Sequence, residues 1–173
     1  MRRTSGKLSV RGYSLIEMMV VVTVIAIIFG ISAPITEVVR DARHNYQASR
    51  FLKAASYAAD EAIKRGVKVN ICGSDSGTAC DAASSSWPGW AVYVDSNGNG
   101  AFNTTEEILQ FFHPKDDFKV KRSTGSSDLA FDENGVTSAA TFWVCSSSSD
   151  DIVLQINAAG RRFAQHKAKQ AVC

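Results

Sequence analysis

The sequence lacks the motifs that mark common enzyme sites. Among its 173 residues there are only three histidines, His44, His113 and His166, and they stand far apart. Neither G-x-S-x-G nor H-E-x-x-H occurs, and the serines gather in tracts typical of turns. No internal repeat is present either. These absences exclude the usual serine-hydrolase and metalloprotease patterns, and they predict a protein without catalytic activity.

Charge is nearly absent from residues 13–33, which read YSLIEMMVVVTVIAIIFGISA and carry only Glu17. A segment of this length can cross the roughly 30 Å hydrocarbon core of a bilayer as a helix. A carboxylate within such a helix costs about 2.5–3.5 kcal/mol on insertion scales and usually has a functional partner. A plain membrane anchor therefore explains the apolar run but does not explain Glu17.

Acidic residues are missing from residues 1–12, which contain four basic residues. Basic residues before an apolar run favour a cytoplasmic location for that end of the chain. Loss of this segment would leave 15 basic and 17 acidic residues, so the net charge would change from +2 to −2. The basic character of the full chain therefore says little about its partners.

Cysteine is absent before residue 72, and no two cysteines form a C-x-x-C pair. No histidine lies within a few residues of Cys72, Cys80 or Cys145, so zinc is a weaker interpretation than disulfide bonds. Four cysteines in an exported domain permit three pairings. We favour Cys72–Cys80, across a Gly/Ser-rich turn, and Cys145–Cys173, which would fix the C-terminus.

The string RGYSLIE at residues 11–17 resembles the G-F-T-L-I-E junction of type IV prepilins and type II secretion pseudopilins. This resemblance implies that a prepilin peptidase cleaves between Gly12 and Tyr13 and methylates the new amino group of Tyr13. It also implies that Glu17 pairs with the amino-terminal charge of a neighbouring subunit. The spacing agrees, because Tyr13 and Glu17 lie one helical turn apart and a buried charge needs a partner.

Helical periodicity continues from Ile35 to about Arg65, with Gly66 as the expected C-cap. We therefore expect one helix over residues 13–65. Pro34 is a further assembly candidate, because the helix could bend or melt there during subunit packing, or simply break where the membrane ends. The expected apolar stripe of the second half, which would cover a sheet, consists of Val38, Ala42, Leu52, Ala55, Ala59, Ala62 and Ile63.

Short β-runs between Gly/Ser/Asn-rich turns follow Gly66. The predicted fold class is α+β, a pilin fold in which a long N-terminal helix, transmembrane in its first half, packs on an antiparallel β-sheet head. The candidate strands are Val67–Cys72, Trp90–Val94, Ile108–His113, Phe118–Val120, Leu129–Phe131, Ala140–Cys145 and Ile152–Asn157. The predicted parts are a leader (1–12), a transmembrane and assembly helix (13–33), an amphipathic helical half (34–66) and a β-rich head with a basic tail (67–173).

Three further stretches resemble the GspH/FimT (FimU-like) subgroup of pilins. They are AIKRG at residues 62–66, WPGWAVYVD at residues 87–95 and a glycine-arginine pair at residues 160–161. Members of this subgroup include minor pilins and minor pseudopilins, which cap or prime a filament rather than form its bulk. The resemblance therefore implies a minor subunit.

Residues 95–106 match the calcium-loop pattern D-x-[DN]-x-[DN]-G-x5-E at every specified position. The oxygens of Asp95, Asn97, Asn99 and Glu106 are ligands of the kind that such a loop uses. The preceding residues read as a strand rather than a helix, and Asn-Gly pairs also form hairpin turns. The turn interpretation is favoured, and calcium is the alternative.

The last 22 residues contain no acid, and Arg161, Arg162, Lys167 and Lys169 give them a charge of +4. A basic patch of this kind can hold phosphates. Some FimT-type pilins bind DNA through a G-R-x-R tail motif, but Phe163 stands here where the last arginine should be. The alternatives are a solvated tail and arginines that pair with acids of neighbouring subunits, and Phe163 would stack on a base or lie in the core.

The sequence therefore predicts a minor subunit that primes or tips a type IV pilus. We expect a single-pass inner-membrane protein with its head in the periplasm, which later joins a pilus or pseudopilus at the cell surface. Expected partners are the prepilin peptidase, the inner membrane before assembly, other major and minor pilins, and DNA through the tail. Two further roles stay open, a minor pseudopilin of a type II secretion system and a DNA receptor in natural transformation. No cofactor is expected.

Overall fold

The computed structural model describes residues 12–32, 35–81, 85–114, 118–123, 128–146, 150–158 and 162–166. The chain divides into two compact units, Met1–Val39 and Arg40–Cys173. Several residues with a predicted role lie outside the described residues, and those predictions stay open: Pro34, Arg161, Lys167, Lys169 and Cys173.

The first unit contains the helix α1, Leu15–Ser32, which is almost entirely apolar. The backbone N–H groups of Glu17 and Met18 donate to the carbonyl oxygen of Ser14, which starts the helix. Large apolar side chains are exposed along its length, with Leu15 at 79% and Phe29 at 73%. Such a surface needs a lipid or protein cover.

None of the helices formed by the described residues has the length and apolarity that crossing a membrane requires. The predicted membrane span at residues 13–33 therefore stays a prediction.

The helix α2, Ile35–Arg65, ends as its sequence indicates. The N–H group of Gly66 donates to the carbonyl oxygen of Ala62 at 2.9 Å, and Gly66 has a φ of 63°. A left-handed residue at this position is a common helix C-cap, and glycine adopts it without a Cβ clash. The C-cap prediction is confirmed. Residues 33–34 are outside the described part, so one continuous helix across Pro34 is not tested.

The buried face of α2 is rotated from the predicted stripe. Ala55, Ala59 and Ala62 are buried as expected, and Leu52 is partly buried. Val38, Ala42 and Ile63 are exposed, against the prediction. Alanines on neighbouring faces blur the periodicity, so the larger side chains decide which face turns inward. The observed buried face consists of His44, Gln47, Ala48, Phe51, Ala54, Ala55, Ala58, Ala59 and Ala62. Of these nine residues the prediction contained only Ala55, Ala59 and Ala62.

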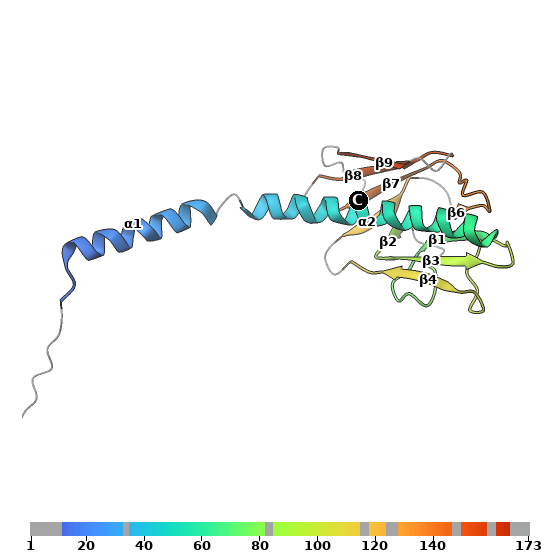
Figure 1. The fold of residues 1–173 in the computed structure, drawn as a ribbon, viewed down its shortest axis with the longest axis horizontal. Helices are drawn as coiled ribbons and strands as arrows, with labels where there is room; N and C mark the ends of the chain where they lie inside the picture. The colour runs from blue at the N-terminus through green and yellow to red at the C-terminus, as the bar shows by residue number, and fades with distance from the viewer. Residues whose placement is uncertain are drawn as a thin grey trace, which may run out of the picture. The chain divides into compact units, whose positions relative to one another are not determined.

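Within the described residues the head forms two antiparallel sheets, whereas the sequence predicted one (Figure 1). The first sheet has the order β4 (Ile108–Phe112), β3 (Trp90–Asp95), β1 (Lys68–Gly73) and β6 (Leu129–Phe131). The second has the order β2 (Ser86–Trp87), β5 (Lys119–Arg122), β7 (Ala140–Cys145), β8 (Ile152–Ile156) and β9 (Arg162–His166).

All seven predicted strands are confirmed to within two residues at each end, and β6 and β7 have the predicted bounds. Two strands were missed. The strand β2 falls at the end of a Ser-rich stretch interpreted as a turn, and it is only two residues long. The strand β9 falls in the basic tail, where alternating polar residues gave no clear strand pattern.

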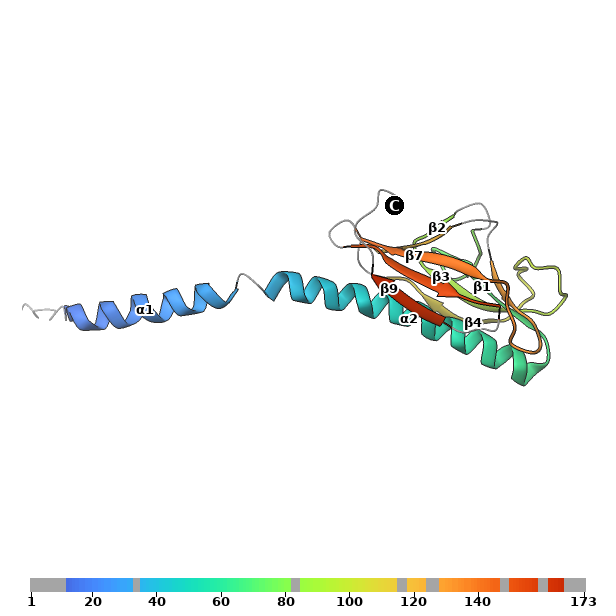
Figure 2. The same cartoon turned by 90° about the horizontal axis from the view of Figure 1, so that it is seen from above.

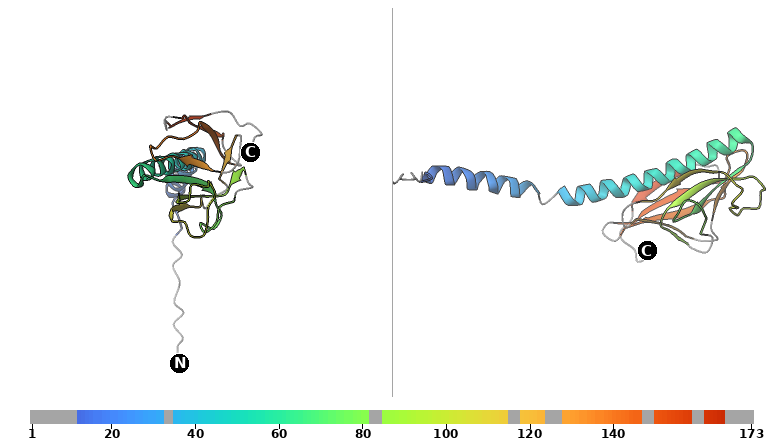
Figure 3. Two further views of the ribbon diagram at one scale, coloured as in Figure 1. Left: turned by 90° about the vertical axis from the view of Figure 1, so that its right-hand side faces the viewer. Right: turned by 90° about the horizontal axis from the view of Figure 1, so that it is seen from below.

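Phe51 is the point at which α2 joins both sheets. Its ring centroid lies 5.4 Å from that of Trp90 in the first sheet. It lies 4.9 Å from that of Phe142 and 6.2 Å from that of Trp87, both in the second sheet. Figures 2 and 3 show α2 along one side of the strands. One fully buried side chain therefore connects three layers of the core.

The WPGW stretch carries the chain from the second sheet to the first, since Trp87 ends β2 and Trp90 begins β3. A Cβ atom on Gly89 would lie 2.6 Å from the carbonyl oxygen of Phe112 and 2.8 Å from that of Ser74. The crossing therefore requires glycine. This stretch, which resembles the GspH/FimT subgroup, has a structural role.

Replacement of Phe51 by alanine should lower the free energy of unfolding of the head by about 3–5 kcal/mol, because a buried ring is lost from between the two sheets. Chemical denaturation would measure this loss. Tyr46→Ala is the matched control on the same helix, because Tyr46 is 55% exposed, and it should cost under about 1 kcal/mol. Equal losses for the two variants would contradict the central position of Phe51.

Candidate assembly segment and head surface

The predicted cleavage site lies just before α1. Gly12 and Tyr13 precede the helix without regular secondary structure, and Tyr13 is 74% exposed. A Cβ atom on Gly12 would meet nothing within 4 Å. An accessible, non-helical peptide bond is the kind of site at which a peptidase can bind the backbone.

Glu17 lies in the first turn of α1, where the helix dipole favours a negative charge. Its side chain is exposed, and no salt bridge to it is found within the part of the chain that the structure describes. The rest of α1 from Leu15 to Ser32 has no other charged residue. The carboxylate therefore lies exposed on a helix that carries no other charge.

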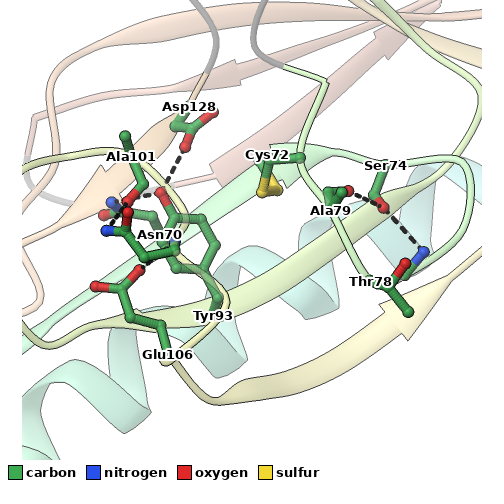
Figure 4. Close-up of a disulfide and its surroundings, with 12 residues drawn as sticks. Asn70, Cys72, Ser74, Thr78, Ala79, Tyr93, Ala101, Glu106 and Asp128 are labelled. Atoms are coloured by element: carbon green, nitrogen blue, oxygen red, sulfur yellow. Dashed lines mark hydrogen bonds between the residues drawn. A yellow bond between two sulfur atoms is a disulfide. The ribbon is translucent and has the colours of Figure 1, made fainter.

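The disulfide Cys72–Cys80 is confirmed, with a Cα–Cα distance of 5.7 Å (Figure 4). Cys145 is disulfide-bonded too, but its predicted partner Cys173 lies outside the described residues, and that pairing stays a prediction. Cys72 and Cys80 belong to a small apolar cluster on the outer face of the first sheet, together with Ala91, Tyr93, Phe102 and Ile108.

The loop that the disulfide closes is held by its own hydrogen bonds. The hydroxyl of Ser74 donates to the carbonyl oxygen of Ala79 at 2.6 Å and accepts from the N–H group of Gly77 at 2.9 Å. Asp75 and the ring of His113 approach to 3.0 Å, which ties the loop to the end of β4. The loop therefore forms an ordered part of the head surface.

A polar network crosses the same face of the first sheet. The hydroxyl of Tyr93 donates to the Asp128 carboxylate at 2.6 Å, and the side-chain amide of Asn70 donates to that hydroxyl at 3.1 Å (Figure 4). Burial raises the pKa of Asp128, although the Tyr93 hydrogen bond and the charge of Arg122 partly oppose this effect. Burial also raises the pKa of Tyr93, so its hydroxyl remains a donor. The network ties β1, β3 and the start of β6 together.

No sequence motif marked this network. Tyr93 belongs to the WAVYVD stretch, and alternation along β3 places it on the face opposite Trp90 and Val92. Asn70 and Asp128 carry no spacing signal, because their partner comes from another strand. Only the pairing of β1 with β3 brings Asn70 opposite Tyr93.

The residues of the calcium pattern lie between two antiparallel neighbours, β3 and β4. Asp95 ends β3, Asn97 and Asn99 are exposed, and Glu106 is buried shortly before β4. The expectation of a turn between strands is confirmed, although the connection is much longer than a two-residue hairpin. Among the described residues, no group of three or more histidine, cysteine, aspartate or glutamate side chains is arranged to hold a metal ion.

The basic tail is described only in part. Arg162 begins β9, which pairs with β8 at the edge of the second sheet, so this part of the tail is a strand rather than a solvated coil. Its side chain and the residues Arg161, Lys167 and Lys169 lie outside the described part. DNA binding through the tail therefore stays a prediction.

Replacement of both Cys72 and Cys80 by serine should destabilise the head by roughly 2.5 kcal/mol, the chain-entropy value for a loop of this length. Denaturation under non-reducing conditions would measure the change. An unfolding free energy equal to that of the wild type would contradict a stabilising role for this disulfide.

Comparison with protein families finds two matches in this chain. Residues 7–33 match the prokaryotic N-terminal methylation motif, which spans the candidate cleavage site and all of α1. Residues 47–160 match the type II transport protein GspH, a stretch that includes most of α2 and the strands β1 to β8. A comparison with curated protein sequences finds no significant match.

Two solved structures are similar to this chain, both of the type IV minor pilin FimU of Pseudomonas aeruginosa. The crystal structure in space group P21 superposes with a TM-score of 0.58 at 21% identity, covering 79% of this chain and 98% of that one. The structure in space group P65 gives a TM-score of 0.55 at 21% identity, covering 73% and 97%. These likenesses establish the α+β pilin fold.

The GspH match covers well over half of the chain, and the methylation motif lies where the sequence places the cleavage junction. The chain belongs to the GspH family of pilin-like proteins.

Proposed function

We propose that this chain is a minor subunit that primes or tips a type IV pilus, that prepilin peptidase cleaves it between Gly12 and Tyr13, and that it assembles through residues 13–33. The observation that carries this proposal is Glu17, a single carboxylate in the first turn of an exposed apolar helix, close behind the methylation junction.

Cleavage after Gly12 would create a positive amino group on Tyr13. Within one subunit Tyr13 stands four residues before Glu17 in the sequence, and in a filament the Glu17 of a neighbour can reach the new amino group. Burial of an unpaired carboxylate in apolar surroundings costs free energy. A packing of subunits that brings the two charges together is therefore more stable than one that does not. The pair would fix the position of one subunit along its neighbour more than it would add net stability, because both charges must lose their water.

In this proposal the apolar surface of α1 is covered first by lipid and later by protein. Before assembly the inner membrane would cover it, with the single helix as anchor and the head in the periplasm. After assembly the helices of neighbouring major and minor pilins would cover it, and burial of apolar area would supply most of the association free energy. The disulfide Cys72–Cys80 suits a head exposed to an oxidising compartment.

The pilus is the first candidate because FimU, whose fold this head shares, is a type IV minor pilin. A minor pseudopilin of a type II secretion system is the second, because the matched family model is described as a type II transport protein. Both machines assemble pilin-like subunits, so their physical requirements for Glu17 are the same. Neither candidate role includes a catalytic step.

Deletion of the gene would separate the two candidates. The pilus proposal predicts fewer surface pili and unchanged secretion of exported proteins, with recovery when the wild-type chain is restored. Measurement of pili by shearing and of secreted protein in the culture medium would show both effects. Normal piliation with blocked secretion would assign the chain to the secretion system instead.

The variant Glu17→Ala should lower the amount of this chain in sheared filaments by about tenfold or more, a difference of at least 1.4 kcal/mol in assembly. Cleavage of residues 1–12 should continue, which the size of the membrane-bound product would show. Thr23→Ala is the matched control, because the Thr23 hydroxyl is already satisfied by the carbonyl oxygen of Val20 in the same helix. Equal incorporation of the Glu17 and Thr23 variants would contradict the assembly role.

A role in DNA uptake would require the basic tail to bind phosphates. In that case the double variant Arg161→Ala, Arg162→Ala should lose salt-sensitive DNA binding in a mobility-shift assay with the purified chain. An unshifted DNA band with the wild-type chain at low salt would rule this role out.

A further inference from the structure

The connection between β3 and β4 is organised around side-chain oxygens. The N–H group of Gly100 donates to Asp95 Oδ2 at 2.9 Å, that of Asn99 to Asn97 Oδ1 at 3.0 Å, and that of Ala101 to Asn99 Oδ1 at 2.8 Å. Side-chain oxygens of three loop residues therefore accept from the loop backbone, and the Oδ1 atoms of Asn97 and Asn99 each keep a second lone pair.

Two carboxylates of this loop are buried without a positive partner. Asp95 is 2% exposed and Glu106 is 8% exposed, and no salt bridge to either is found among the described residues. Lys68, which lies opposite Asp95 in the pairing of β1 with β3, is exposed and makes no such bridge. Buried charges in proteins are normally paired or bound to a metal.

The hydrogen bonding of one Asp95 oxygen points more directly to a bound ion than the burial of the two carboxylates does. Its Oδ2 accepts from Gly100 and, at 3.4 Å, from the side chain of Asn70. Its Oδ1 is buried and has no hydrogen-bond partner within the described part of the chain. The bond to Gly100 orients the carboxylate toward the loop. A buried oxygen without a donor is rare in native proteins, and a bound ion is one of its regular explanations.

Glu106 closes the loop from its other end. Its Oε1 accepts from the N–H group of Ser96 at 3.1 Å, and its Oε2 accepts from that of Asn103 at 2.9 Å. The ring of Phe102 packs on Tyr93 at a centroid distance of 5.3 Å, which anchors the middle of the loop to β3. The two buried carboxylates, twelve positions apart when both are counted, are thus held at the two ends of one fixed loop.

We propose that the β3–β4 loop binds a calcium ion through Asp95, Asn97, Asn99 and Glu106. The donors are all oxygens, and their spacing is that of a calcium loop. Gly98 and Gly100 have φ values of 72° and 77°, which lets the backbone turn sharply around the ion. The flanking elements are strands rather than helices, so the loop connects the two strands of a β-hairpin. The site is independent of how the filament assembles.

The charge of the donor set determines the expected affinity. Two of the four side chains are neutral amides, and calcium loops become weaker as the number of charged ligands falls. We therefore expect a dissociation constant on the order of 10⁻⁴ to 10⁻³ M, the range of extracellular calcium modules. Magnesium demands a stricter octahedral shell and should bind more weakly to an amide-rich loop.

Calorimetric titration of the purified full chain in detergent, freed of metal by a chelator, would test the proposal with CaCl₂ as the probe. The wild type should show one saturable site, and calcium should raise its unfolding temperature. Asp95→Asn and Glu106→Gln should each weaken binding by at least tenfold. The matched control is Glu107→Gln, whose exposed carboxylate pairs with Arg65 and lies outside the loop, and it should bind as the wild type does.

Asn97→Ala keeps the test valid if the buried variants fail to fold, because Asn97 is exposed. This variant should retain the calcium-free unfolding temperature and lose most of the calcium-dependent increase. Absence of saturable binding at millimolar calcium in the wild type would overturn the proposal. Binding that is equally strong in the Asn97, Asp95 and Glu107 variants would overturn it as well.

Discussion

The proposed assembly depends on the lone charge of the apolar helix α1. Glu17 lies in the first turn of that helix, and the exposed side chains around it are apolar. In such surroundings a carboxylate is tolerated only when a positive group comes close to it. The match to the methylation motif supports the proposed cleavage after Gly12, which would create that group on Tyr13. In this proposal, processing creates the positive charge that assembly requires.

The head meets a different physical requirement, which is to bury one face of α2 under two small sheets. Phe51 contacts aromatic rings from both sheets, and Gly89 lets the chain cross between them. On the outer face of the first sheet, the disulfide loop and the Phe102 loop cover a second, smaller cluster.

Sequence periodicity was sufficient for much of this fold and insufficient for the rest. The apolar run, the Gly66 C-cap and seven strands follow from local patterns, because the burial of an element determines the spacing of its apolar residues in the sequence. The rotation of α2 was missed since alanines occur on several of its faces. The second sheet was missed because its separation depends on which strands pair, and pairing joins residues far apart in the chain. The Asp95 oxygen, which has no hydrogen-bond partner among the described residues, was not predictable, because the sequence pattern of the loop fits a simple turn equally well.

The amino terminus of the mature chain tests the central claim most directly. Mass analysis of the chain recovered from membranes and filaments should show a product that begins at Tyr13, carries one methyl group on its amino nitrogen and retains Glu17. In a strain without prepilin peptidase the chain should stay intact from Met1 and remain out of filaments. Recovery of an uncleaved chain that begins at Met1 from assembled filaments of the wild-type strain would contradict the account.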